Sequence, residues 1–107
     1  MTARLLVYNR ANDNDQGYIL DFEMNDIRRK RLLYRANYRG FKEADLLLGG
    51  FAKANIERFT EDDLSAFEHL LEAKDHDIYN WITGKTAVPA QYDTPLFTRL
   101  RLFKPEI

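Results

Sequence analysis

The stretch "YRGFKEADLLLGGF", residues 38–51, contains the joint between two predicted helices. Gly40 is a plausible helix end, because glycine enters the left-handed C-terminal conformation without steric cost. The next apolar residues have the i, i+3, i+4, i+7 spacing of a buried helical face: Ala44, Leu47, Leu48 and Phe51. Gly49 and Gly50 weaken this second helix, and the pair predicts a kink or close packing of another helix there.

A first helix is expected before this joint. Asn25 or Asp26 can cap its start, and its apolar face consists of Ile27, Leu32, Leu33 and Ala36. A third helix follows the joint. Its start signal is "TEDD" (60–63), a capping hydroxyl followed by acids, and its buried stripe consists of Leu64, Phe67, Leu70 and Leu71.

Two shorter helices complete the pattern. The fourth begins at about Asp77, with Asp75 or Asp77 as its cap, and ends at Gly84. The fifth begins at Thr94-Pro95, a capping residue followed by proline at the first helical position, and ends before Pro105. Residues 25–107 are therefore expected to form an all-α fold, a compact bundle of five short helices.

Residues 1–24 are expected to be a flexible or non-core N-terminal arm. Two short apolar clusters, 5–8 and 18–20, flank a stretch rich in turn formers and could pair as a hairpin. An isolated hairpin is marginal in water, so a loose arm is an equal alternative. Met24 lies where the helical pattern begins, and we expect it to be a candidate for the natural start of the protein.

Composition narrows the function classes. A chain of 107 residues, 45% hydrophobic and 31% charged, is typical of one globular domain. The absence of cysteine excludes disulfides, thiolate metal sites and cysteine nucleophiles. His69 and His76 lack the convergent spacing of a metal site, and no catalytic motif is visible. We therefore expect a protein that is not an enzyme and holds no metal.

Charge is unevenly distributed along the chain. Residues 26–42 carry seven basic and one acidic residue, whereas residues 57–77 carry eight acidic and two basic ones. This predicts opposed charged patches on the surface. A helical stripe of arginines could bind phosphates, so a basic-helix nucleic-acid binder remains one alternative: Arg28, Arg31, Arg35 and Arg39.

The opening stretch allows two interpretations. In the first it is only a joint, with Arg39 paired to Glu43. In the second it is an interaction surface, because arginine and large aromatic residues are enriched at protein interfaces. The residues that surround Gly40 fit this second interpretation: Tyr38, Arg39, Phe41 and Lys42.

Residues 26–103 resemble the succinate dehydrogenase assembly factor family, also called FAD assembly factors (SdhE). The resemblance rests on "RGFKEAD" (39–45), which fits an Arg-Gly-x-x-Glu signature followed by an apolar residue and Asp. It also rests on "LLEAKDHDIYNWITG" (70–84), an acidic turn followed by an Asn-Trp helix. The resemblance implies a partner-binding site: Arg39, Gly40, Glu43 and Asp45, which Tyr38 and Phe41 extend. Arg39 and Glu43 are expected to contact the partner, so that replacing either should leave folding intact.

The resemblance also implies the function. Such a protein is a non-catalytic chaperone that binds the flavoprotein subunit of succinate dehydrogenase and promotes covalent attachment of FAD to a histidine of that subunit. Fumarate reductase is left open as a second client. No permanently bound cofactor is expected, and a transient FAD contact is left open, as is a generic interaction role such as that of an antitoxin. We expect a monomer without nucleic acid or membrane as partners. We also expect a bacterial cytoplasmic protein rather than a mitochondrial one, because Asp13 and Asp15 are unusual in transit peptides.

Overall fold

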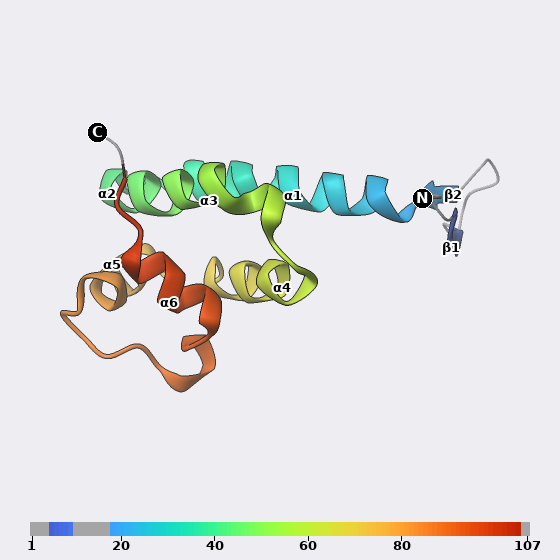
Figure 1. Cartoon of the computed structure of the whole chain (residues 1–107). Coiled ribbons are helices and arrows are strands. Elements are labelled where there is room, and N and C mark those ends of the chain that lie inside the picture. Colours follow the sequence, from blue (N-terminus) through green and yellow to red (C-terminus); the bar gives the residue numbers. More distant parts are fainter. Residues whose placement is uncertain (1–4, 10–17, 106–107) are drawn as a thin grey trace.

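The computed structural model describes residues 5–9 and 18–105, and the side chains from residue 23 onward. Five helical rods account for most of the described residues, which confirms the predicted all-α bundle (Figure 1). The first rod is α1 (Asp21–Asn37). The second is continuous and consists of α2 (Lys42–Ala44), the π-helix η1 (Asp45–Gly49) and α3 (Gly50–Asn55). The others are α4 (Glu61–Leu70), α5 (Asp75–Thr83) and α6 (Pro95–Leu102).

The rods lie in two layers around one core. Figure 1 shows α1 beside the α2–η1–α3 rod, with α4, α5 and α6 below them. At the centre the rings of Phe51, Phe59 and Phe67 pack with centroids 5.5 to 6.2 Å apart. All rods contribute fully buried side chains, among them Leu32, Leu48, Leu64, Ile78 and Leu100.

Two short strands precede the helices. β1 (Leu5–Asn9) and β2 (Tyr18–Leu20) pair antiparallel, with Leu5 opposite Leu20. The structure therefore has the paired arrangement rather than the loose one. Figure 1 shows this pair at the far end of α1, away from the other helices. The division into an arm (1–24) and a helical domain (25–107) stays a prediction.

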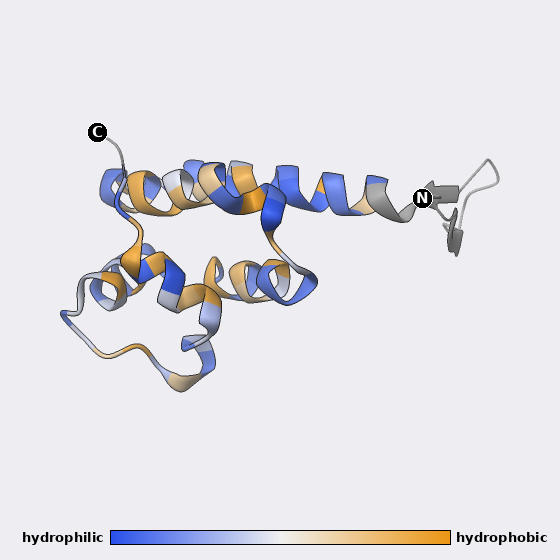
Figure 2. Ribbon diagram, viewed as in Figure 1, coloured by the Kyte–Doolittle hydropathy of each residue, from blue (hydrophilic) through white to orange (hydrophobic). Residues whose placement is uncertain are grey.

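The N-terminal half of α1 differs from the sequence-based expectation. The helix begins at Asp21 instead of at Asn25 or Asp26, because β2 leads directly into it. Ile27 was expected on the apolar face but is 42% exposed. Figure 2 shows that this half of α1, where it extends past α4, is mainly hydrophilic.

The predicted ends of the other helices are confirmed, with one exception. Thr60 and Asp63 form a reciprocal capping box at the start of α4. Gly84 ends α5 in the left-handed conformation, and the Thr94 hydroxyl accepts the Phe97 N–H at the start of α6. The exception is α5, whose N-cap is Lys74, without a side-chain cap, instead of Asp75 or Asp77.

The opposed charged patches stay a prediction, but one basic residue of α1 contacts two acidic residues of α4 where the two helices lie side by side. The Arg28 guanidinium on α1 contacts Glu68 and Glu61 of α4 at 2.8 and 2.7 Å. The hydrogen bond from Arg28 lowers the pKa of Glu68 below its ordinary value. Arg29 donates to backbone carbonyls at 2.9 and 2.8 Å and so turns back onto the protein. The continuous basic stripe needed for phosphate binding is therefore absent from the described part of α1.

The two glycines of the second rod permit close packing, as predicted. A Cβ placed on Gly49 would overlap Asn37 Oδ1 and lie 3.3 Å from the Ala36 carbonyl oxygen, both on α1. A Cβ on Gly50 would lie 3.2 Å from the Phe103 ring. The rod also contains the π-helical turn η1 beside these glycines. The close approach of α1 and the rod fixes the direction in which the turn between them points.

We predict that Gly49→Ala lowers the free energy of unfolding by about 1–3 kcal/mol, because the added methyl group overpacks the contact with α1. This holds although alanine is the better helix former. Urea unfolding of Gly49→Ala, Asn37→Ala and the double variant measures the effect as a double-mutant cycle. The double variant should recover part of the loss, since the overlapping Asn37 side chain is removed. Strictly additive losses would show that the Asn37 contact does not limit this position.

Candidate interaction site at the turn after α1

The turn that joins α1 to the second rod is closed by local hydrogen bonds. Gly40 has a φ of +88°, which is the left-handed conformation predicted for a helix end. The Arg39 N–H donates to Asp45 Oδ1 at 2.7 Å, and the Asp45 N–H donates to the Phe41 carbonyl oxygen at 2.9 Å. The carboxylate of Asp45 therefore holds the turn from inside and has a structural contact of its own.

The Arg39 side chain lies inside the protein, only 11% exposed. Its guanidinium donates to Asp75 Oδ1 at 2.5 Å, to the Leu71 carbonyl oxygen at 2.7 Å and to the Ala73 carbonyl oxygen at 2.9 Å. Leu71 and Ala73 lie between α4 and α5, and Asp75 is the first residue of α5. Carbonyls at a helix end lack partners within the helix, and a cation satisfies them well. Arg39 thus links the joint of the upper layer to the joint of the lower layer.

This arrangement corrects two expectations for Arg39. It does not pair with Glu43, because its guanidinium binds Asp75 and the two carbonyls. It also does not project outward as a directed contact. The contacts make Arg39 a positioning residue, whose loss should impair folding.

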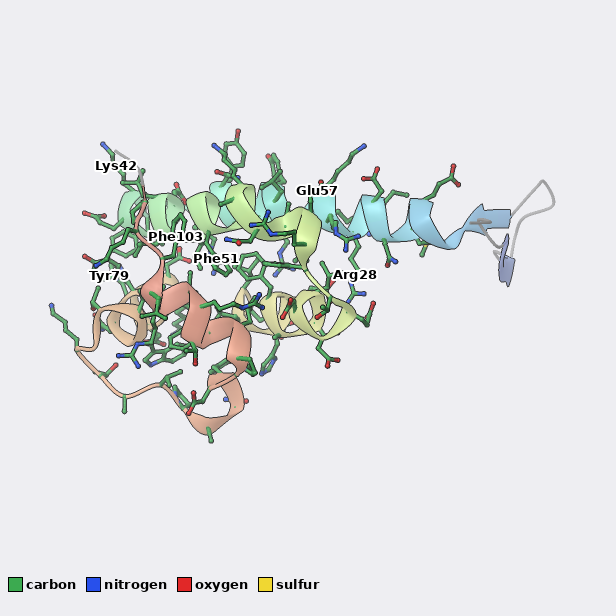
Figure 3. The ribbon with its side chains drawn as sticks, viewed as in Figure 1. Arg28, Lys42, Phe51, Glu57, Tyr79 and Phe103 are labelled. Atoms are coloured by element: carbon green, nitrogen blue, oxygen red, sulfur yellow. The ribbon has the colours of Figure 1, made fainter. Side chains whose placement is uncertain are left out.

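Phe41 is a second inward-facing residue of the turn. Its ring lies 4.4 Å from the His76 ring and 5.5 Å from the Tyr79 ring, measured between centroids. Both rings belong to α5, and Figure 3 shows Tyr79 on the lower side of the turn, across from Lys42. Phe41 is half-buried and packs against the core. It therefore fixes the start of the second rod on α5.

The outward face of the turn consists of Tyr38, Gly40 and Glu43, and we call these three residues the turn surface. Tyr38 is 69% exposed. A Cβ on Gly40 would meet no atom within 4 Å, so the backbone there is open. Glu43 is exposed, and its carboxylate has no hydrogen bond or ion pair with any residue that the structure describes. An unpaired acid on a rigid turn is free to accept donors from another protein.

Tyr34 extends this surface and was missed by the sequence analysis. Its ring is 65% exposed and lies 4.5 Å from the ring of Tyr38, which follows one helical turn later, just after the end of α1. The i, i+4 spacing of two tyrosines on the polar face of α1 was the signal that could have found it. Two exposed tyrosines beside an open backbone are typical of a protein interface.

The histidines and acidic residues in the described part of the chain do not converge on one site. Among them no group of three or more His, Asp or Glu side chains could hold a metal ion. His69 stacks on Tyr92 with ring centroids 4.7 Å apart, and His76 packs on Phe41. No helix in the described ranges is long and apolar enough to cross a bilayer. The geometry of the turn is suited to binding.

We predict that Arg39→Ala lowers the free energy of unfolding by about 3 kcal/mol, because it leaves a partly buried carboxylate and two carbonyls without their donor. Arg39→Lys should recover little, since an ammonium group cannot reproduce three directed contacts. Glu43→Ala is the control, and its stability should stay within about 0.5 kcal/mol of wild type. Urea unfolding measures all three. An Arg39→Ala protein as stable as Glu43→Ala would contradict the structural role.

Comparison with known proteins places this chain in a family. The family described as "Flavinator of succinate dehydrogenase" matches residues 30–104, which contain the turn and all the contacts of Arg39. The FAD assembly factor SdhE of Acetobacter pasteurianus is 40% identical over 73 residues, covering 68% of this chain and 67% of that protein.

Two mitochondrial relatives are also similar to this chain. Succinate dehydrogenase assembly factor 2 of Dictyostelium discoideum is 48% identical over 66 residues, covering 62% of this chain and 47% of that protein. The factor of the same name from Drosophila grimshawi is 39% identical over 77 residues, covering 70% and 52%. The chain thus spans about half the length of these mitochondrial relatives. Because the family match covers residues 30–104, well over half of the sequence, this chain belongs to the family of succinate dehydrogenase flavinators.

Proposed function

We propose that this protein binds the flavoprotein subunit of succinate dehydrogenase and promotes covalent attachment of FAD to that subunit. The family match supports this proposal, because it extends from within α1 to the segment after α6. The observation that carries it is the turn surface: an open glycine and an unpaired glutamate, held in place by buried contacts of Arg39. We infer that this turn, and not a pocket for chemistry, is what the protein offers to its partner.

In this proposal the chemistry belongs to the partner. The flavin and the histidine that accepts it are part of the flavoprotein subunit, and this chain acts without a catalytic residue. A helper accelerates such a reaction only if it binds the reactive arrangement of the subunit more tightly than other arrangements. No permanently bound cofactor is proposed, although a transient contact with FAD in the complex is compatible with this role.

Each residue of the turn has a distinct part in the proposed complex. Glu43 accepts hydrogen bonds from the subunit, and Gly40 lets the backbone of the subunit approach closely. Tyr38 and Tyr34 provide rigid aromatic contact area, which costs little conformational entropy on binding. Arg39 acts through the turn, because its contacts keep this surface ordered before binding and so reduce the cost of association.

The proposed cellular location rests on the similarity to the bacterial relative. We propose a bacterial cytoplasmic protein that acts as a monomer, with fumarate reductase as a possible second client. A generic interaction module, such as an antitoxin, is the second candidate, because an exposed aromatic and acidic surface does not by itself specify a flavoprotein. Co-purification separates the two, since a flavoprotein subunit supports the first and an unrelated protein supports the second.

We predict that Glu43→Ala abolishes covalent flavin on the subunit while the protein stays folded. Loss of a desolvated charged contact at an interface costs about 2–5 kcal/mol of binding, which is roughly 30-fold or more in affinity. The assay is flavin fluorescence of the denatured subunit, from cells whose only copy of this protein is the variant. Glu57→Ala is the matched control, an exposed glutamate near the other end of the rod. Full flavinylation with Glu43→Ala would remove Glu43 from the site.

Gly40 provides an independent arm of the same assay. Asn tolerates the left-handed conformation better than Ala, so Gly40→Asn should melt closer to wild type than Gly40→Ala. Both variants place a side chain in the open space above the turn, and both should reduce flavinylation. A Gly40→Asn protein with normal flavinylation would show that the subunit does not approach this backbone.

A further inference from the structure

A groove lies next to the turn surface, between the second rod and the C-terminal segment. Its volume is about 680 Å³. Lys42, Leu46 and Lys53 line it from the rod, and Phe103 to Pro105 line it from the other side. Leu46 is 42% exposed, and the Phe103 ring packs against Gly50. The groove therefore combines apolar surface with a charged border, and we call it the lysine groove.

The charge of the lysine groove is not compensated within the described structure. Lys42, Lys53 and Lys104 line it, and none has an ion pair with a described carboxylate. Arg28 and Arg99, in contrast, are paired with acids. Asp45 is the one acid on the lining, and it already accepts the Arg39 N–H. Among the described residues that line the groove, three lysines and one carboxylate leave an excess of two positive charges.

The spacing of the lysines favours an extended ligand over a compact one. Lys42 and Lys53 are eleven residues apart on a continuous rod, which corresponds to about 16 Å along the helix axis. A diphosphate is too short to reach both. Diphosphates also bind where backbone N–H groups are free, typically at a helix N-terminus, whereas η1 and α3 in the middle of the groove use theirs within the rod. About five residues of extended chain would span the same distance.

We propose that the lysine groove binds an acidic segment of the flavoprotein subunit, one that also carries an apolar side chain for the surface of Leu46 and Phe103. This inference rests on the proposed function and extends it, because Lys42 and Asp45 belong both to the groove and to the segment that forms the turn. The lysines attract the acidic segment over a long range and speed the encounter. Glu43 and Gly40 then make the short-range contacts.

The test compares two charge reversals of equal size. Lys53→Glu reverses the charge of a lysine in the groove, at the opposite end of the rod from Lys42. Lys85→Glu is the control, because Lys85 is an exposed lysine on the loop after α5. Association of each variant with the purified flavoprotein subunit is measured by stopped-flow at low and high salt. Lys53→Glu should slow association by about tenfold or more at low salt and much less at high salt. Lys85→Glu should associate like wild type, and both should melt like wild type.

The outcomes separate this inference from the proposed function. If wild type binds the subunit and Lys53→Glu associates as fast as Lys85→Glu, the lysine groove is not used, while the proposed function stands. If wild type does not bind the subunit at all, both fail. A titration with free FAD provides the remaining check. If wild type binds FAD and Lys53→Glu does not, the groove is a nucleotide site, and the proposal that it binds an acidic segment is overturned.

Discussion

The arrangement of the two layers depends on the hydrogen bonds that the buried guanidinium of Arg39 donates. It satisfies the carbonyls of Leu71 and Ala73, which lie between α4 and α5, and the carboxylate of Asp75, the first residue of α5. Its own N–H fixes the turn between α1 and the second rod through Asp45. One residue therefore connects the two joints.

This constraint explains why the "RGFKEAD" stretch is both a joint and a surface. The residues of this stretch face two directions: Arg39, Phe41 and Asp45 contact the protein, whereas Gly40 and Glu43 face solvent. The inward contacts stabilise a left-handed turn with an open backbone. The outward residues can then be selected for a partner without loss of stability, which suits a protein that must hold a larger subunit in one arrangement.

Local signals in the sequence predicted most of the fold, and long-range contacts account for what they missed. Thr60, Gly84 and Thr94-Pro95 each act within a few residues, so the helix ends that they mark were predicted correctly. Arg39 and Asp75 are 36 positions apart in the sequence. No local pattern shows whether Asp75 accepts a hydrogen bond from a distant arginine or caps its own helix. The exposure of Ile27 and the convergence of three lysines likewise depend on which helices cover α1 and the rod.

Amide hydrogen exchange tests most directly whether the turn after α1 is the pre-ordered surface that the flavoprotein subunit contacts. In the free protein the amides of Arg39 and Asp45 should exchange slowly, because both are hydrogen-bonded within the turn. Addition of the purified flavoprotein subunit should increase protection across residues 38–45 and leave the loop at 85–94 unchanged. Fast exchange at Arg39 in the free protein, or new protection confined to other segments, would contradict this account.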